Sequence, residues 1–146
     1  MTITRVRVKA ASELLAPPDD VWALLAEPRH LSDWWPGYRA VRPDRRGLAV
    51  GARWGVVRSQ AGLLRRPGEE GLVAITAVEQ NRRLAWQDVQ QRFTATVDLE
   101  GDDGQTRARV TVEAPWSRML FEGLRLAPQE ALSRLHALCQ TAAGLH

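Results

Sequence analysis

The stretch that decides the fold is "APPDDVWALLAEPRHLSDWWPGY", residues 16–38. Its prolines end the strand before it, because proline cannot donate a ladder hydrogen bond, and Asp19 or Asp20 is expected to cap a first short helix. A second short helix is expected over residues 28–34, ended by "WPG". The stretch also carries four aromatic residues: Trp22, Trp34, Trp35 and Tyr38. Aromatic side chains at this density indicate either core packing or the wall of a pocket.

Strand patterns surround this stretch on both sides. Residues 2–15 alternate between apolar and charged side chains, which is typical of a half-buried strand. From residue 38 to residue 114 the pattern predicts about six further strands, with "ARWGVVRSQAGLLR" and "GLVAITAVEQ" forming a hairpin around "RPGEE". The run "TRARVTVEA" comes last, after the turn "GDDGQ". Together these runs predict an antiparallel meander.

One hairpin of this meander has a testable register. The segment "RRLAWQDVQQRFTATVDLE" contains two alternating runs around a polar turn near Val89 and Gln90. A turn of two residues gives the following opposed pairs: Asp88 with Gln91, Trp86 with Phe93, and Leu84 with Ala95. Trp86 and Asp88 are two residues apart in the strand and share a face of the sheet, so if Trp86 points inward, Asp88 does as well.

The C-terminal segment, residues 115–144, is expected to be helical. Pro115 is a favourable helix start, and one apolar stripe runs along the segment. The stripe consists of Leu120, Leu124, Ala131, Leu135, Leu138 and Ala142. Pro128 is expected to kink this helix or to split it in two, because it removes a hydrogen bond and crowds the preceding turn.

In this order of elements the chain resembles the START-related helix-grip (SRPBCC) superfamily, and most closely its polyketide cyclase/dehydrase branch. The residues that carry the resemblance are "ELLAPPDDVWALLAEPRHLSDWWPGYRAV", "GLAVGARW", "AVEQNRRLAWQ" and the amphipathic helix over 128–143. The resemblance implies an α+β, helix-grip fold: a curved antiparallel sheet wrapped around a long C-terminal helix, with two short helices after the first strand. It also implies a single domain over residues 1–146 and a cavity between sheet and helix for a hydrophobic or aromatic molecule.

Composition excludes several other classes of protein. Cys139 is the sole cysteine of 146 residues, so no disulfide can form within the chain, and no Cys/His spacing predicts a metal site. We expect no cofactor, no membrane span and a cytoplasmic location, since neither a signal peptide nor a long apolar run is present. The 20 basic residues, which leave a net charge of +3, are spread among acidic ones, so nucleic-acid binding is not expected.

The candidate site combines aromatic and polar side chains. The side chains expected to contact a ligand are Trp34, Trp35, Tyr38, Trp54, Trp86, Phe93, Leu120 and Leu124. Arg58 shares strand parity with Trp54, and Asp88 shares it with Trp86, so this pair is the catalytic candidate: a carboxylate as general base and an arginine that holds an enolate or a carboxylate. Two alternatives stay open. The aromatic rings could fill a solid core, and Arg58 and Asp88 could form a salt bridge at the rim.

Three functions follow from this reading. The first is binding of a small hydrophobic or aromatic ligand in the internal cavity, as a carrier or sensor does. The second is a cyclase, aromatase or dehydratase acting on such a ligand, which needs a positioned acid or base as well. The third is a protein-interaction module with an exposed aromatic patch, and the chain is expected to be a monomer or a homodimer.

Overall fold

Seven antiparallel strands form one sheet in the order β1-β7-β6-β5-β4-β3-β2. The structure, a computed structural model, describes residues 4–58, 70–102, 104–121 and 124–144; the side chains of residues 120–121 and 142–144 lie outside the description. The strands are β1 (Arg5–Leu14), β2 (Tyr38–Arg42), β3 (Arg53–Arg58), β4 (Glu70–Glu79), β5 (Arg83–Asp88), β6 (Phe93–Gly101) and β7 (Thr106–Pro115). The helices are α1 (Pro18–Ala26), the 3-10 helix η1 (Pro28–His30), α2 (Leu31–Trp34), α3 (Trp116–Phe121) and α4 (Ala127–Gly144).

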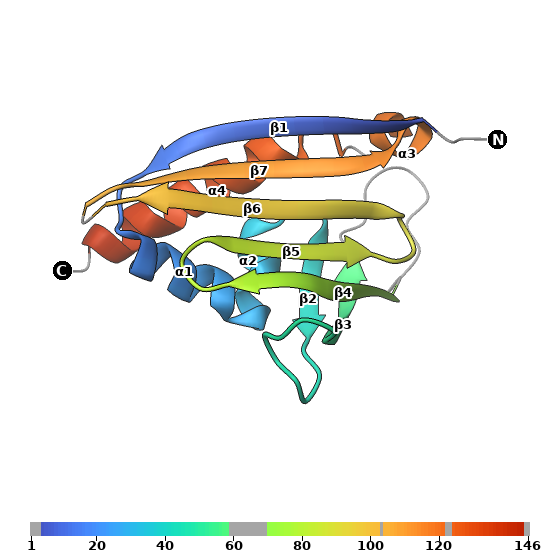
Figure 1. Cartoon of the computed structure of the whole chain (residues 1–146), viewed down its shortest axis with the longest axis horizontal. Coiled ribbons are helices and arrows are strands. Elements are labelled where there is room, and N and C mark those ends of the chain that lie inside the picture. Colours follow the sequence, from blue (N-terminus) through green and yellow to red (C-terminus); the bar gives the residue numbers. More distant parts are fainter. Residues whose placement is uncertain (1–3, 59–69, 103, 122–123, 145–146) are drawn as a thin grey trace.

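The helices lie on one face of the curved sheet. Helix α4 packs on β1, on β7 and against α2, while η1 and α2 pack on β2 (Figure 1). This is the α+β, helix-grip arrangement that the sequence predicts, with two short helical segments after the first strand. The face that α4 covers is called the inner face here, and the opposite one the outer face.

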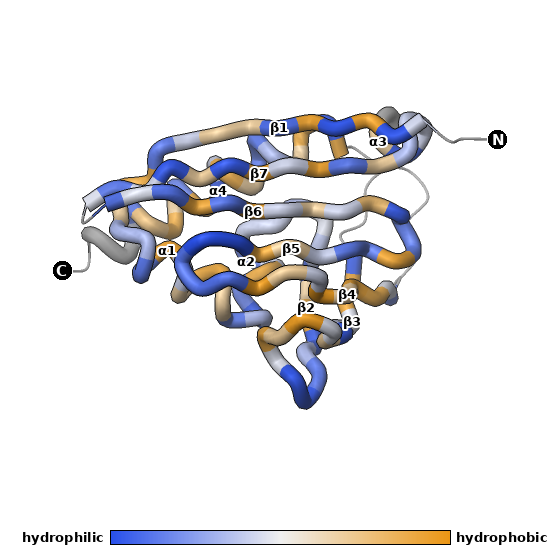
Figure 2. The backbone as a smooth tube through the Cα atoms, in the orientation of Figure 1, coloured by the Kyte–Doolittle hydropathy of each residue, from blue (hydrophilic) through white to orange (hydrophobic). Residues whose placement is uncertain are grey.

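Alternating side chains explain why one face of the sheet is buried. Along β1 the exposed and partly buried residues alternate, and along β7 every second residue from Thr106 to Ala114 is buried. Hydrophilic and hydrophobic residues alternate along both strands in the backbone view (Figure 2). Because successive side chains of a strand point to opposite faces, this period of two directs the apolar set towards α4 and the charged set towards solvent. The half-buried strand predicted from the alternation of residues 2–15 is confirmed by β1.

The start of α1 differs from the prediction. Helix α1 begins at Pro18, its N-cap residue is Pro17, and no side chain caps it. Asp19 and Asp20 therefore do not cap the helix but occupy its first turn, where a negative charge interacts favourably with the helix dipole. The second predicted helix, over 28–34, is confirmed as η1 followed by α2.

The β5–β6 hairpin has a longer turn than predicted. Asp88 pairs with Phe93, Trp86 with Ala95 and Leu84 with Val97, so the register differs from the expected one by two residues. Residues 89–92 form the turn, in which the Arg92 N–H donates to the Asp88 carbonyl at 2.9 Å and Arg92 adopts a φ of 61°. A shift by two residues keeps every side chain on its face, so Trp86 and Asp88 still point inward.

The C-terminal segment forms two helices, which is one of the two outcomes expected from Pro128. The split precedes the proline, however: α3 ends at Phe121 and α4 begins at Ala127, which makes Pro128 the second residue of α4. At that position the missing N–H removes no helical hydrogen bond, so Pro128 starts a helix and does not kink one. Pro115, expected to start the helix, is instead the last residue of β7.

Strands β3 and β4 form the predicted antiparallel pair, with Trp54 opposite Val73 and Val56 opposite Gly71. Of the predicted turn "RPGEE", only Glu70, the first residue of β4, is among the described residues. Tyr38 of β2 lies opposite Arg58 of β3. This edge of the sheet therefore brings together residues from before and after segment 59–69 and from the first aromatic stretch.

Candidate functional site

Arg58 and Asp88 form an ion pair inside the protein. The Arg58 Nη2 atom lies 2.5 Å from Asp88 Oδ1, and the two side chains are 7% and 0% exposed. These exposures contradict the alternative of a salt bridge at a solvated rim. The structure thus brings together the two residues that sequence parity placed on one face.

The pair spans three strands, because Arg58 reaches from β3 across β4 to β5. Gly71 of β4 lies beneath the guanidinium: a Cβ atom at this position would lie 2.5 Å from Nη1 and 2.7 Å from Cζ of Arg58. No real Cβ contact is this short, so only glycine lets the arginine pass over β4 at this height. Gly71 is a residue of the site that sequence reasoning missed, since an isolated glycine in a strand indicates close approach without naming the partner.

Asp88 accepts hydrogen bonds from three directions. Besides Arg58, the Tyr38 hydroxyl donates to Oδ2 at 2.8 Å and the Gln91 backbone N–H donates to Oδ1 at 3.0 Å. Gln90 supports the arrangement from the turn, because its Oε1 accepts from Leu72 N at 2.8 Å and from Arg58 Nη2 at 3.5 Å. A buried charge needs such donors to offset the loss of water, and here β2, β3 and the β5–β6 turn supply them.

Burial raises the pKa of Tyr38 well above its ordinary value. The negative charge of Asp88 and the hydrogen bond to its carboxylate raise the pKa of Tyr38 further, while an interaction with the Trp86 side chain and, less strongly, the charge of Arg58 lower it. The hydroxyl therefore stays protonated and donates to Asp88 throughout the physiological pH range. This role for Tyr38 was not predicted, since the sequence contains no sign that Tyr38 and Asp88 meet.

An aromatic cluster adjoins these polar groups. Trp35 is in its centre, with ring centroids 5.0 Å from Trp86, 5.9 Å from Phe93 and 6.3 Å from Tyr38. The Trp34 ring meets Trp86 edge to face at 5.7 Å. All five side chains are at most 2% exposed. Trp34 and Trp35, both expected to contact a ligand, are therefore buried in this cluster.

Among the residues that the structure describes, three buried donor groups of this region form no hydrogen bond. They are Trp34 Nε1, Trp86 Nε1 and Arg58 Nη1. An unpaired buried polar group is costly and uncommon, so three in one region need an explanation. All three are N–H donors, which means that a group able to satisfy them must carry acceptor atoms.

The remaining predicted ligand contacts are placed differently. Trp54 is buried on β3, and its Nε1 donates to the Gly47 carbonyl at 2.8 Å, so its polar edge is held by the segment before β3. Leu124 is buried in the core. Leu120 is in α3, but its side chain lies outside the described residues. Two hollows formed by described residues open on the outer face, and neither is lined by a member of the aromatic cluster.

The described residues include no group of three or more His, Cys, Asp and Glu side chains arranged to hold a metal ion. Cys139 is buried, and burial, with a contribution from the charge of Asp20, raises the pKa of its thiol. A thiol shifted in this direction is a weak nucleophile at neutral pH. No helix in the described part of the chain is long and apolar enough to cross a membrane.

Comparison with solved structures shows which proteins share this fold. A crystal structure from Nitrosomonas europaea superposes with a TM-score of 0.72 at 22% identity, covering 95% of this chain and 97% of the other. A solution structure from Arthrobacter aurescens gives 0.72 at 21% identity, covering 92% and 86%. Norcoclaurine synthase from Thalictrum, a point mutant in complex with a transition-state analogue, gives 0.70 at 16% identity, covering 98% and 99%.

Sequence comparison adds the family. A search of curated proteins found no match. The family model described as "Polyketide cyclase / dehydrase and lipid transport" matches residues 5–140, which is nearly the whole chain and includes every residue of the site described above. The chain therefore belongs to the polyketide cyclase/dehydrase and lipid transport family.

Proposed function

We propose that the inner face of the sheet binds a small hydrophobic or aromatic molecule that carries an oxygen acceptor. The observation that carries this proposal is the group of three buried donors without partners beside the aromatic cluster. The family supports the general part, because its description covers both cyclase chemistry and lipid transport. The buried N–H donors and the aromatic rings support the specific part, which is that the ligand carries an oxygen acceptor on an apolar skeleton.

The donor set favours one class of ligand. A protonated amine has no acceptor to offer to Arg58 Nη1 or to the indole N–H groups, so cationic ligands do not fit. A carboxylate would bring a second negative charge close to Asp88, whose own charge Arg58 already balances. A neutral acceptor, such as a ketone or an ether on a flat apolar skeleton, satisfies the donors without that repulsion.

Binding is better supported than catalysis by Asp88. Its carboxylate already accepts from Arg58, Tyr38 and the Gln91 N–H, which leaves few lone pairs to take a proton from a substrate. One observation favours a second candidate, a cyclase or dehydratase reaction: the Tyr38 hydroxyl and the Asp88 carboxylate are 2.8 Å apart, within reach for proton transfer. For this second candidate function, we propose Arg58 and Asp88 as the catalytic pair.

A matched pair of ligands tests the binding proposal. We expect 2-acetylnaphthalene, which carries a ketone, to quench tryptophan fluorescence saturably and to bind about tenfold more tightly than 2-ethylnaphthalene, which has a similar size and no oxygen. Trp86→Ala should weaken binding of the ketone by about 1–3 kcal/mol if the ring contacts it. Absence of saturable binding by either compound would contradict the proposal.

The variant Arg58→Lys isolates the free donor. Lysine keeps the charge opposite Asp88 but lacks the second guanidinium nitrogen, so the preference for the ketone should decrease while binding of the hydrocarbon stays unchanged. Arg83→Lys, on the outer face, is the matched control and should alter neither.

Native mass spectrometry of freshly purified protein identifies any co-purified molecule, which is then the substrate to test for turnover. Turnover that is lost in Asp88→Asn would establish the enzyme candidate. Binding without turnover in both proteins would favour the carrier.

A further inference from the structure

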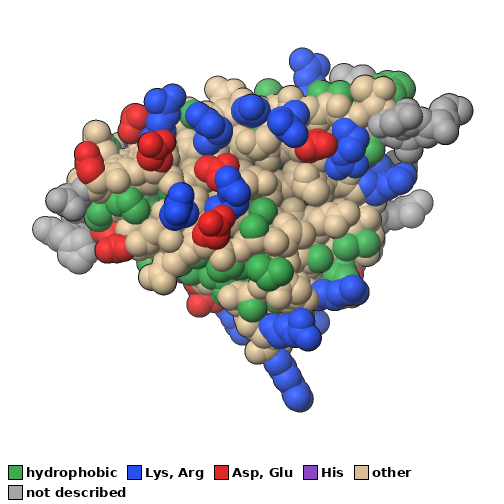
Figure 3. All heavy atoms as spheres, viewed as in Figure 1, with side chains coloured by type: hydrophobic (Ala, Val, Ile, Leu, Met, Phe, Trp, Pro, Cys, Tyr) green, Lys and Arg blue, Asp and Glu red, His purple; other side chains and the backbone are tan. Residues whose placement is uncertain are grey.

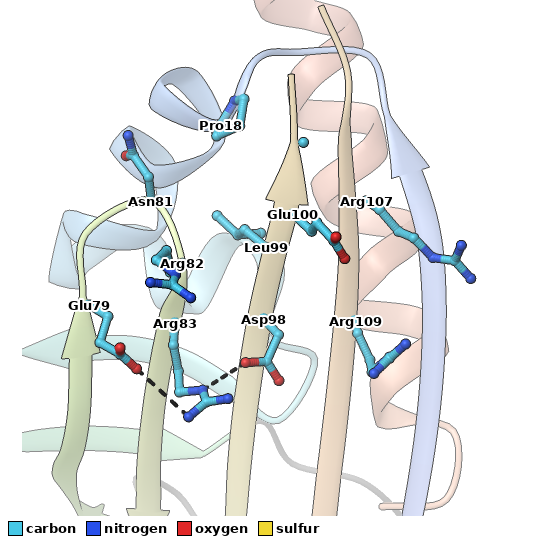
Figure 4. Close-up of a pocket in the computed structure, with 11 residues that line it drawn as sticks. Pro18, Glu79, Asn81, Arg82, Arg83, Asp98, Leu99, Glu100, Arg107 and Arg109 are labelled. Carbon is cyan, nitrogen blue, oxygen red and sulfur yellow. Dashed lines mark hydrogen bonds and ion pairs between the residues drawn. The ribbon is translucent and has the colours of Figure 1, made fainter. Parts of the chain in front are cut away.

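Two neighbouring hollows form a trough across the outer face of the sheet. The larger, of about 620 Å³, lies where α1, the β4–β5 turn, β6 and β7 meet (Figure 4). The smaller, of about 360 Å³, lies over the middle of β4 to β7. Arg83 and Asp98, which form an ion pair, line both hollows, so the two are adjacent and are together called the outer trough here.

Small side chains explain why the outer face is hollow. The residues under the smaller part of the trough include Ala77, Ala85, Thr94, Thr96 and Thr111. Outward positions in the middle of a sheet can hold long side chains, and such side chains would fill this space. Charged side chains surround the small ones, as the view of this face shows (Figure 3).

The charges of the outer trough are unevenly paired. Arg83 forms an ion pair with a carboxylate on each side. Its Nε lies 2.7 Å from Asp98 Oδ1, and its Nη1 lies 3.7 Å from Glu79 Oε2 (Figure 4). Arg7 is 3.2 Å from Glu113. In the described part of the chain, by contrast, no ion pair is formed by three exposed arginines of the larger hollow: Arg82, Arg107 and Arg109.

Few carboxylates remain to balance these arginines. Glu79, Asp98 and Glu113 are engaged by Arg83, Arg7 and Arg5, so among the described lining residues only Glu100 is left. Among the lining residues, three arginines without an ion pair therefore stand beside one carboxylate without one, and Glu13 of β1 lies opposite Arg107 in the sheet. The trough offers a surplus of donors that are suited to carboxylate oxygens.

We propose that the outer trough is a docking surface for an acidic segment of a partner protein. An ion pair with one exposed arginine strengthens binding by less than about tenfold, so a small anion alone would be held weakly. A protein segment adds contact with the alanine and threonine floor to the charge interactions, and arginine is enriched in such interfaces.

The charge pattern also decides between classes of partner. Carboxylates of Glu79, Asp98 and Glu100 stand between the arginines and would repel a continuous phosphate backbone, whereas a polypeptide can carry acidic residues at intervals and neutral ones between them. The trough and the aromatic cluster are on opposite faces of the sheet, so this proposal does not depend on the proposed function.

Fluorescence anisotropy with a labelled peptide of alternating glutamate and serine tests the proposal at low salt. We expect saturable binding that weakens as salt is added, and Arg107→Gln/Arg109→Gln should weaken it by about tenfold. The matched control is Arg39→Gln/Arg42→Gln, which removes the same charge from exposed positions on β2 outside the trough and should change the affinity by less than about twofold.

Mapping of the peptide on the unmodified protein provides a second readout that needs no variant. In a nitrogen-15 NMR titration the shifted amides should belong to β6, β7 and the β4–β5 turn. Equal weakening by the two double variants would overturn the proposal, since net charge alone would then explain binding. Tighter binding of a labelled RNA duplex than of the peptide, amide shifts elsewhere, or no measurable peptide binding would each overturn it as well.

Discussion

Gly71 shows how one residue determines whether the polar site can form. Its missing side chain is the space in which the Arg58 guanidinium crosses β4 to reach Asp88. A methyl group there would push the guanidinium away and leave the Asp88 carboxylate without its cation, which is the costly way to break a buried pair. The Arg58–Asp88 ion pair therefore depends on Gly71, which contributes no side chain of its own.

The substitution Gly71→Ala is expected to lower the free energy of unfolding by about 1–3 kcal/mol, because the added Cβ forces Arg58 out of place. Gly55→Ala on β3 is the matched control, since the nearest atom to a Cβ there is 3.9 Å away. We expect less than about 0.5 kcal/mol for it. Urea unfolding of both variants measures the difference, and equal effects would contradict the steric argument.

Tyr38 makes the pH dependence of the site measurable, because it is the sole tyrosine of the chain. The folded state raises its pKa and so holds the phenol proton more tightly than the unfolded state does. Its contribution to stability is therefore complete below the ordinary pKa of about 10 and declines as the pH rises from there towards the folded-state pKa. We expect tyrosinate absorbance to appear only as the protein unfolds at high pH, while Tyr38→Phe removes that signal. A titration near the ordinary value in protein with a native circular dichroism spectrum would contradict the burial of the hydroxyl.

At the scale of elements, the β5–β6 turn positions Asp88. The turn donates the Gln91 N–H to Asp88 and contributes Gln90, which binds β4 and Arg58. It closes through Arg92 in the left-handed region, with a φ of 61°. A residue with a Cβ is strained there, and glycine is not.

We therefore expect Arg92→Gly to raise the free energy of unfolding by about 0.5–1 kcal/mol. Arg92→Ala is the control, because it removes the same side chain but keeps the Cβ, and it should have little effect. Thermal unfolding of both proteins compares them. A gain in stability from alanine as large as that from glycine would show that the side chain, not the backbone, was responsible.

At the scale of the whole molecule, one core joins the sheet to the helices. The buried set runs from Leu14 of β1 through Trp34 and Trp86 to Leu135 of α4, so no part of the sheet has a core of its own. We expect a single cooperative unfolding transition in which tryptophan fluorescence and far-ultraviolet circular dichroism coincide. Two separated transitions would contradict the prediction of a single domain over residues 1–146.

The sequence by itself determined the order of the strands and helices and the face of those strands whose apolar and polar residues alternate. Alternation along residues 5–14 and 106–115, and the two prolines at the start of α1, carry this information locally, because the period of side chains follows from backbone geometry alone. The predicted register of the β5–β6 hairpin was wrong by two residues, since periodicity does not distinguish a turn of two residues from one of four. Each side chain still lies on the predicted face of the sheet, because a shift of two residues does not change the face to which a residue points.

Only the tertiary structure decided which side chains meet. Arg58 and Asp88 were predicted to share a face, but their contact depends on three strands in register and on the glycine between them. The bond from Tyr38 to Asp88 and the separation of Trp54 from the aromatic cluster depend on how β2 and β3 pair, including an irregularity between Tyr38 and Ala40. The outer trough likewise needs β4 to β7 side by side. Such contacts join residues far apart in the chain, and the short-range patterns of a single sequence contain no information on the distances between them.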